Sequence, residues 1–284
     1  MPNLEHVKIS VLMPIYDTNP QYLREAIESI LNQTFSVFEF LILNDSPDNL
    51  ELGQIVKSYQ DNRIVYVVNE KNIGISASRN KLLMMARGEY IAVMDHDDIS
   101  LPERFQEEVK ILENDPYIGV VSCFFRKMGT EKITKRPVEN QDIVRGLISR
   151  HCYLLHPASM IRMSVLKEND VSYEEEFSPA EDYALWCRLI GKTKFYNIAT
   201  VLFLYRDHDN NTSSRQRSKM KLATKRVYEF ARIQHPELWN ETKNKIRYFI
   251  KFFGIPIIKV KKDSCFTTQF SLLGFIPFYK KEND

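Results

Sequence analysis

Short apolar runs alternate with amphipathic stretches between residues 8 and 100. Four runs have the length and composition of buried strands: KISVLMPIY, FEFLILND, RIVYVV and EYIAVMD. The stretches between them carry apolar residues at helical spacing, as PQYLREAIESILNQ does at Leu23, Ile27, Ile30 and Leu31. Because strands separated by helices of this length form βαβ units, the pattern predicts an α/β protein with a mainly parallel sheet and helices on both faces.

The pattern becomes mixed beyond residue 100. LPERFQEEVKILEND predicts a helix, YIGVVSCFF predicts a strand, and the polar stretch 131–150 predicts a loop over the sheet edge. HPASMIRMSVL and KFYNIATVLFLYR predict further strands around an acidic segment, SPAEDYALWCRL. The chain has helical character from about residue 214 to 250, and its tail holds a small repeat, FFGIPIIKVK and LLGFIPFYKK.

Composition and charge narrow the class of protein. Of the 284 residues 44% are apolar, which suffices for a sizeable core, and a formal charge of +2 gives no overall attraction to nucleic acid. The four cysteines form no CxxC pair, which disfavours a zinc site and suits reduced thiols. No signal-peptide pattern and no run of ~18 apolar residues occurs. We therefore expect a cytoplasmic protein that does not span a membrane.

Polar residues follow each of the first four predicted strands, at positions 14–17, 44–46, 69–72 and 95–98. In parallel sheets these carboxyl ends meet at one edge, where ligands bind. A GxGxxG loop is missing after the first strand, where the chain reads MPIYDTNP, and no Walker loop occurs. The sheet would therefore bind a nucleotide without a glycine cradle, and the diphosphate would be left to a metal ion.

The fourth strand runs into IAVMDHDD, which places two carboxylates two residues apart. Asp95 and Asp97 are hard oxygen donors suited to Mg²⁺ or Mn²⁺, and such a cation would itself be a receptor for phosphate. The alternative is a strand-end loop in which Asp98 or Ser100 caps the following helix. Because DxD is short and common, the motif alone leaves both interpretations open.

Six segments taken in order resemble the nucleotide-sugar glycosyltransferases of family 2, which have the GT-A fold. They are SVLMPIYD, SILNQTFSVFEFLILNDS, NIGISASRN, GEYIAVMDHDD, AEDYALWCRL and YRDHDNNTS. The resemblance covers roughly residues 7 to 215 and implies a GT-A catalytic domain over 1–215. Its nucleotide half would reach about residue 100 and its acceptor half would span 101–215, followed by a helical and basic amphipathic tail over 216–284.

The resemblance assigns the nucleotide contacts. It places Pro14, Tyr16 and Asp17 near the base and ribose, and it makes Asp45 the acceptor of the uracil N–H. Asn44 departs from the family pattern, which has an acid there. Arg79 would face uracil or diphosphate oxygens, and its alternative is a solvated helix charge.

The resemblance also assigns metal ligands. Asp97 would bind the metal directly, and Asp95 would contact either the ribose or the metal. His96, between them, is grouped with the nucleotide-contacting residues, although a packed or solvent-facing histidine is its alternative. His208 in the YRxHxxNxS segment would be a third ligand, since neutral imidazole suits Mn²⁺, and a structural hydrogen bond is its main competitor.

The pair Glu181-Asp182 matches the acidic pair that the family carries at the start of a helix. The resemblance makes Asp182 the base that takes the proton of the acceptor hydroxyl, while Glu181 orients the acceptor or the base. The alternative is that both are N-terminal helix charges stabilised by the dipole. Trp186, four residues further, is either core or a wall for the acceptor.

The function implied is an inverting, metal-dependent transfer of a hexose or N-acetylhexosamine from a nucleotide diphosphate sugar, with UDP preferred through Asp45. The acceptor would be a saccharide or a lipid-linked molecule in surface polysaccharide or lipopolysaccharide synthesis. One rival is a regulatory or scaffold protein that binds nucleotide sugars without turnover, and it would not need the acidic pair. A second rival, a nucleotidyltransferase, would carry a glycine-rich loop after the first strand.

Seven Lys or Arg and no Asp or Glu lie between Lys243 and Lys262, interleaved with aromatic and branched residues. That composition favours a segment on the anionic inner face of a membrane, which would make the enzyme peripheral. The alternative is an appendage that packs on the catalytic domain.

Overall fold

The computed structural model describes residues 7–208, 211, 215–244, 248–252, 255–263, 267–272 and 276–282. Within these ranges, nine strands form one sheet with β7 attached at its side. The strands are β1 (Ile9–Ile15), β2 (Phe38–Asn44), β3 (Ile64–Val68), β4 (Tyr90–Val93), β5 (Ile99–Ser100), β6 (Ile118–Lys127), β7 (Ile133–Thr134), β8 (Met160–Arg162) and β9 (Lys194–Tyr205). Their spatial order is β3-β2-β1-β4-β8-β6-β9-β5, and β7 pairs with β6.

The predicted βαβ units are confirmed. Strands β3, β2, β1 and β4 are parallel neighbours. The helices that connect and follow them are α1 (Pro20–Leu31), α2 (Leu50–Lys57), α3 (Ile75–Met85) and α4 (Arg104–Asn114). The Asn19 side chain begins α1 by accepting the backbone N–H groups of Gln21 and Tyr22.

The three-residue strand β8 changes the direction of pairing twice. It is antiparallel to β4 on one side and antiparallel to β6 on the other. Two reversals restore the original direction, and β9 is parallel to β6. The carboxyl end of β9 therefore lies at the same edge of the sheet as the carboxyl end of β4.

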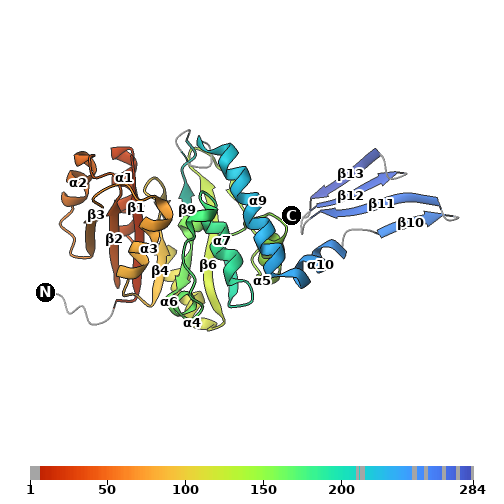
Figure 1. Ribbon diagram of the computed structural model, residues 1–284, viewed down its shortest axis with the longest axis horizontal. Helices are drawn as coiled ribbons and strands as arrows, with labels where there is room; N and C mark the ends of the chain where they lie inside the picture. The colour runs from red at the N-terminus through yellow and green to blue at the C-terminus, as the bar shows by residue number, and fades with distance from the viewer. Residues whose placement is uncertain are drawn as a thin grey trace.

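The core has one layer on each face of the sheet, because side chains alternate along a strand. Val11 and Met13 of β1 belong to the cluster covered by α1, α2 and α4. Leu12, between them, belongs to the cluster covered by α3, α5 (Asn140–Ile148), α7 (Glu181–Leu189) and α9 (Arg217–Gln234). Figure 1 shows the sheet between these helices.

Two local predictions for residues 131–168 are wrong. The stretch 131–150 is not a loop, because it contains β7 and then α5, which buries Ile143, Leu147 and Ile148 among polar neighbours. HPASMIRMSVL is not one strand either: a 3₁₀ turn (His156–Ala158) and α6 (Met163–Glu168) flank β8. In both stretches the elements are too short for their periodicity to be recognised.

The predicted helical character of the C-terminal part is confirmed only to Asn244, by α9 and α10 (Pro236–Asn244). Beyond it the helical prediction is wrong. Four strands form a second, antiparallel sheet: β10 (Tyr248–Phe252), β11 (Ile255–Asp263), β12 (Thr267–Leu272) and β13 (Ile276–Glu282).

The internal repeat explains this second sheet. Each copy reaches from the end of one strand into the next, so the repeat corresponds to two hairpins, β10–β11 and β12–β13. Gly and Pro disfavour a continuous helix there, and the aromatic and β-branched neighbours favour strands. The prediction that these side chains meet a membrane lies outside the described side chains. Where the chain is described, no helix has the length and apolar character needed to cross a bilayer.

A buried ion pair on α4 connects this helix to the carboxyl end of β4. Arg104 and Glu108 are both fully buried, with 3.1 Å between Nε and Oε1. The guanidinium also donates to the carbonyl oxygens of Val93 and Ser159, at 3.0 and 3.2 Å. The pair therefore ties α4 to the strand that leads into the acidic turn.

We expect Arg104→Met to lower the free energy of unfolding by about 3–5 kcal/mol, because it leaves the Glu108 carboxylate buried without its partner. Chemical denaturation measures this change. Lys110→Met is the matched control: Lys110 and Glu107 form an exposed pair on the same helix, worth less than about 1 kcal/mol. Equal effects of the two substitutions would contradict a structural role for the buried pair.

Candidate active site

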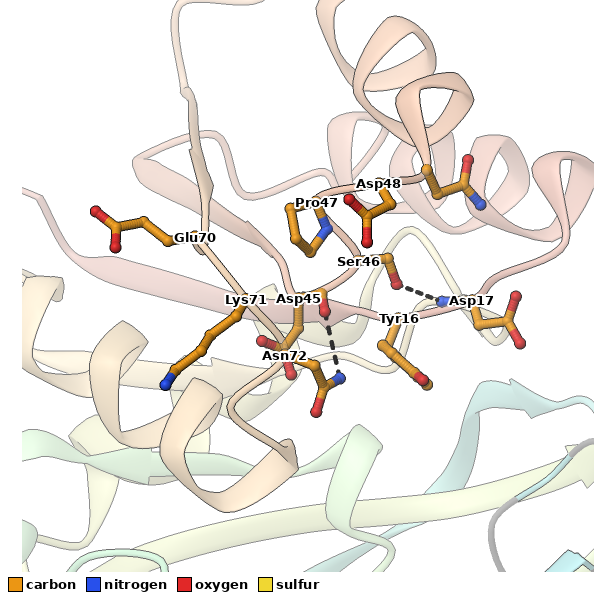
Figure 2. A pocket seen from close by; sticks show the side chains of 10 residues that line it. Tyr16, Asp17, Asp45, Ser46, Pro47, Asp48, Glu70, Lys71 and Asn72 are labelled. Carbon is orange, nitrogen blue, oxygen red and sulfur yellow. Dashed lines mark hydrogen bonds between the residues drawn. The ribbon is translucent and has the colours of Figure 1, made fainter.

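The polar residues that follow the first strands meet at one edge of the sheet, as predicted. The register pairs Ile15 with Asn44 and Asn44 with Val68, so the chain leaves β1, β2 and β3 at the same level. A pocket of about 340 Å³ lies there, lined among others by Tyr16, Asp17 and Asp45 (Figure 2).

The walls of this pocket are fixed by the local backbone. Tyr16 is 55% exposed. Asp17 has a φ of 44°, in the left-handed region, and its N–H donates to the Ser46 hydroxyl at 2.9 Å (Figure 2). Pro14 lies earlier in β1, opposite Leu43, and is not among the lining residues. Its predicted contact with a nucleotide stays a prediction.

The Asp45 carboxylate organises the loop after β3, which the sequence gave no reason to expect. One oxygen accepts from the Asn69 side chain at 2.7 Å and the Ile73 N–H at 2.9 Å, and the other accepts from the Gly74 N–H at 3.0 Å. A carboxylate offers about four acceptor positions, so one of them has no donor among these contacts, and the predicted bond from a uracil N–H stays a prediction.

Asn44, the departure from the family pattern, is buried beside Asp45. Its side chain donates to the Tyr66 hydroxyl at 3.0 Å and accepts the Ser46 N–H at 2.8 Å. An amide can do both, whereas a carboxylate could only accept.

The acidic turn after β4 meets the segment after β9. Asp97 Oδ2 and His208 Nε2 lie 2.9 Å apart, and Asp98 accepts the backbone N–H of Arg206 at 2.7 Å. The alternative of a capped strand end is wrong, because α4 begins after Glu103 and no side chain caps it.

Two of the three predicted metal ligands therefore lie together. Adjacent ligands of an octahedral ion with bonds of ~2.1 Å are ~3.0 Å apart, close to the separation of Asp97 Oδ2 and His208 Nε2. In the described part of the chain, no three His, Cys, Asp or Glu side chains group around one point. The hydrogen bond between them is the structural alternative stated for His208. The same separation would also suit a cation completed by phosphate oxygens and water, so metal binding by this pair stays a prediction.

Asp95 faces Arg79 instead. Arg79 Nη2 lies 3.3 Å from Asp95, and its Nη1 lies 2.6 Å from Glu181. Burial alone would lower the pKa of Arg79, but the charges of Asp95 and Glu181 raise it. The alternative of a solvated helix charge is wrong, since Arg79 is buried. Its predicted contact with the nucleotide is untested.

Glu181 and Asp182 begin α7 next to this bridge. Glu181 is buried and forms an ion pair with Arg79, so its role is not limited to the helix-dipole stabilisation given as the alternative. Asp182 accepts the N–H of Tyr183 at 2.7 Å. Burial and the negative charge of Glu181 raise the pKa of Asp182, and the positive charge of Arg79 lowers it. The net result is a pKa of about 6. A carboxylate with that pKa can accept a proton near neutral pH.

The remaining predictions concern two aromatic side chains. Trp186 is fully buried, which confirms that it belongs to the core. The Nδ1 of His96 is buried and has no hydrogen-bond partner among the described residues, and its predicted contact with a nucleotide remains untested.

Sequence reasoning missed two residues of the site. Tyr173 stacks near Arg79, with 5.4 Å from ring centre to guanidinium, and its hydroxyl lies 2.9 Å from His156 Nε2. Arg206 touches the acidic turn through its backbone and its side chain. The YRxH segment could have indicated Arg206, whereas no local pattern marks Tyr173.

A protein-family model matches more than half of the chain. The sequence model described as glycosyl transferase family 2 matches residues 10–169. An uncharacterized glycosyltransferase of Methanocaldococcus jannaschii is 36% identical over 222 residues, which are 75% of this chain and 76% of that one. The chain belongs to glycosyl transferase family 2.

Other relatives have more specific names. The O-antigen biosynthesis glycosyltransferase WbnJ of Escherichia coli is 29% identical over 78% of this chain and 88% of its own. The structure resembles Staphylococcus aureus TarS 1–349 in complex with UDP-GlcNAc, with a TM-score of 0.62, 19% identity, and coverage of 83% and 79%.

It also resembles the mannosyltransferase PcManGT of Pyrobaculum calidifontis in complex with GDP-Man and Mn²⁺, with a TM-score of 0.57, 14% identity, and coverage of 86% and 75%. At such identities the two structures show a shared fold only, and that fold is GT-A.

Proposed function

We propose that the chain is an inverting glycosyltransferase that moves a hexose or N-acetylhexosamine from a UDP-sugar to a saccharide or lipid-linked acceptor in surface polysaccharide synthesis. The observation that carries the proposal is the Arg79 bridge, which holds the acidic turn beside the helix of Asp182. The relative named for O-antigen biosynthesis and the TarS complex with UDP-GlcNAc agree with this acceptor class and this donor.

In this proposal the nucleoside occupies the pocket between Tyr16, Asp17 and Asp45, and the open acceptor position of Asp45 takes the uracil N–H. Asp97 and His208 would hold Mn²⁺ or Mg²⁺, and such an ion would supply positive charge to offset the departing diphosphate. The mannosyltransferase complex with Mn²⁺ supports a divalent metal in this fold.

Asp182 is the proposed base. The acceptor oxygen forms a bond to C1 of the sugar as the bond from C1 to the diphosphate breaks, and Asp182 takes the proton of the acceptor hydroxyl. Glu181, fixed by Arg79, orients this group. A single displacement inverts the configuration, so an α-linked donor gives a β-linked product.

The rival of a non-catalytic nucleotide-sugar binder would need the pocket but no base. A carboxyl group whose pKa is raised to about 6 beside the donor site favours turnover. A nucleotidyltransferase is disfavoured by the missing glycine-rich loop after β1.

We expect calorimetric titration with UDP, GDP and CDP to show Mn²⁺-dependent binding of UDP alone, and Asp97→Ala to abolish the metal-dependent part. Asp142→Ala, which removes a partly exposed acid on α5 that pairs with Arg145, is the control and should bind as the wild type does. If none of the three nucleotides binds, the proposal is wrong, and if GDP or CDP binds instead, only the base preference is wrong.

The pH profile tests the role of Asp182. The base must be ionised, so we expect kcat/KM to rise with pH through about 6, and Asp182→Asn to lose that limb together with nearly all activity. Glu181→Gln removes a charge that raises the pKa of Asp182, so its limb should move to lower pH. A pH profile of Asp182→Asn that keeps the wild-type limb would assign the base to another residue.

We also propose that the enzyme is peripheral on an anionic membrane and that α9 contributes to this contact. Residues 215–234 carry seven Lys or Arg and one Glu. Ala223, Val227 and Ala231 are buried against the domain, while Leu222 and Ile233 are 53% and 68% exposed. Basic residues beside exposed apolar ones are typical of a helix at a membrane surface.

Replacing Lys219, Lys221 and Lys225 by Gln should weaken binding to phosphatidylglycerol vesicles by roughly 100-fold, at ~1 kcal/mol for each basic residue. Flotation of vesicles with and without the anionic lipid measures the effect. Gln at the exposed Lys57, Lys110 and Lys132 is the matched control. If the α9 variant floats as well as the wild type does, α9 does not bind the membrane.

A further inference from the structure

Arg206 binds the acidic turn at two points. Its backbone N–H donates to the Asp98 carboxylate, and its Nε donates to the carbonyl oxygen of Asp97, each at 2.7 Å. Both atoms that it contacts belong to the turn that carries the Asp97 carboxylate. The position of this one guanidinium therefore affects where that carboxylate lies.

Helix α1 fixes the guanidinium from the other side. Glu25 accepts a hydrogen bond from Arg206 Nη2, and its second oxygen accepts from the Gln21 amide at 2.9 Å. The guanidinium lies over the Tyr22 ring at 4.0 Å, and the His208 ring centre is 5.5 Å from the same ring. Tyr22 and Glu25 are three residues apart, so they share one face of the helix.

We propose that Glu25 is a positioning residue for the metal-binding pair of Asp97 and His208, acting through Arg206 while Tyr22 supports both Arg206 and His208. The inference rests on the proposed function, because that function assigns the cation to Asp97 and His208. A carboxylate partner holds the guanidinium on the backbone oxygen of Asp97. Without that partner, Arg206 is free to pair with the Asp97 carboxylate and to compete with a cation for it.

The experiment measures Mn²⁺ affinity by calorimetry in the presence of saturating UDP. We expect Glu25→Gln to weaken Mn²⁺ binding by roughly 10–100-fold, the range for residues that orient metal ligands. Binding of UDP without metal and the thermal midpoint should change little. Glu28→Gln is the matched control, because Glu28 lies on the same helix but accepts from the Tyr59 hydroxyl.

The route through Arg206 is tested in the Arg206→Gln background, where Glu25→Gln should cause no further loss of Mn²⁺ affinity. Full additivity of the two substitutions, or wild-type Mn²⁺ affinity in Glu25→Gln, would overturn the inference and leave the proposed function intact. Failure of the wild-type protein to bind Mn²⁺ with UDP would overturn the proposed function and this inference with it.

Discussion

The arrangement of the site depends on one buried cation between two carboxylates. Arg79 lies in α3, Asp95 follows β4, and Glu181 begins α7. Without the guanidinium, the repulsion between Asp95, Glu181 and Asp182 would be uncompensated. The same contact sets the protonation of Asp182, because Arg79 limits how far burial and Glu181 raise its pKa.

Much of the fold could be predicted from periodicity. Strands β1, β2 and β4 are buried on both faces and the half-buried β3 is also apolar, so all four give continuous apolar runs. These runs predicted the parallel order and the common edge of the carboxyl ends. Short elements could not be predicted: α5 has only three large apolar residues that are buried, and β8 has three residues in all. Beyond Asn244 the sequence has Gly and Pro inside apolar runs. We interpreted these residues as interruptions of a helix, whereas the runs belong to two hairpins.

The site was predictable where a strand end or a family motif marked a residue, and not where a partner lies far away in the sequence. Asp97 and His208 come together across 111 residues because β8 restores the strand direction between β4 and β9. Arg79 and Glu181 are 102 residues apart, and nothing local indicates that they pair. The sequence indicated a free acceptor at Asp45, but its carboxylate already accepts three hydrogen bonds from the loop between Asn69 and Gly74.

The shortness of β8 decides what holds the two sides of the sheet together. Only three residues of β8 pair with β4, and two pair with β6, so few backbone hydrogen bonds join these sides. Both hydrophobic clusters, however, contain residues from β1 and from β6. The sheet is therefore continuous mainly through its core side chains, and a substitution in the core on one side of β8 would be transmitted to the other side.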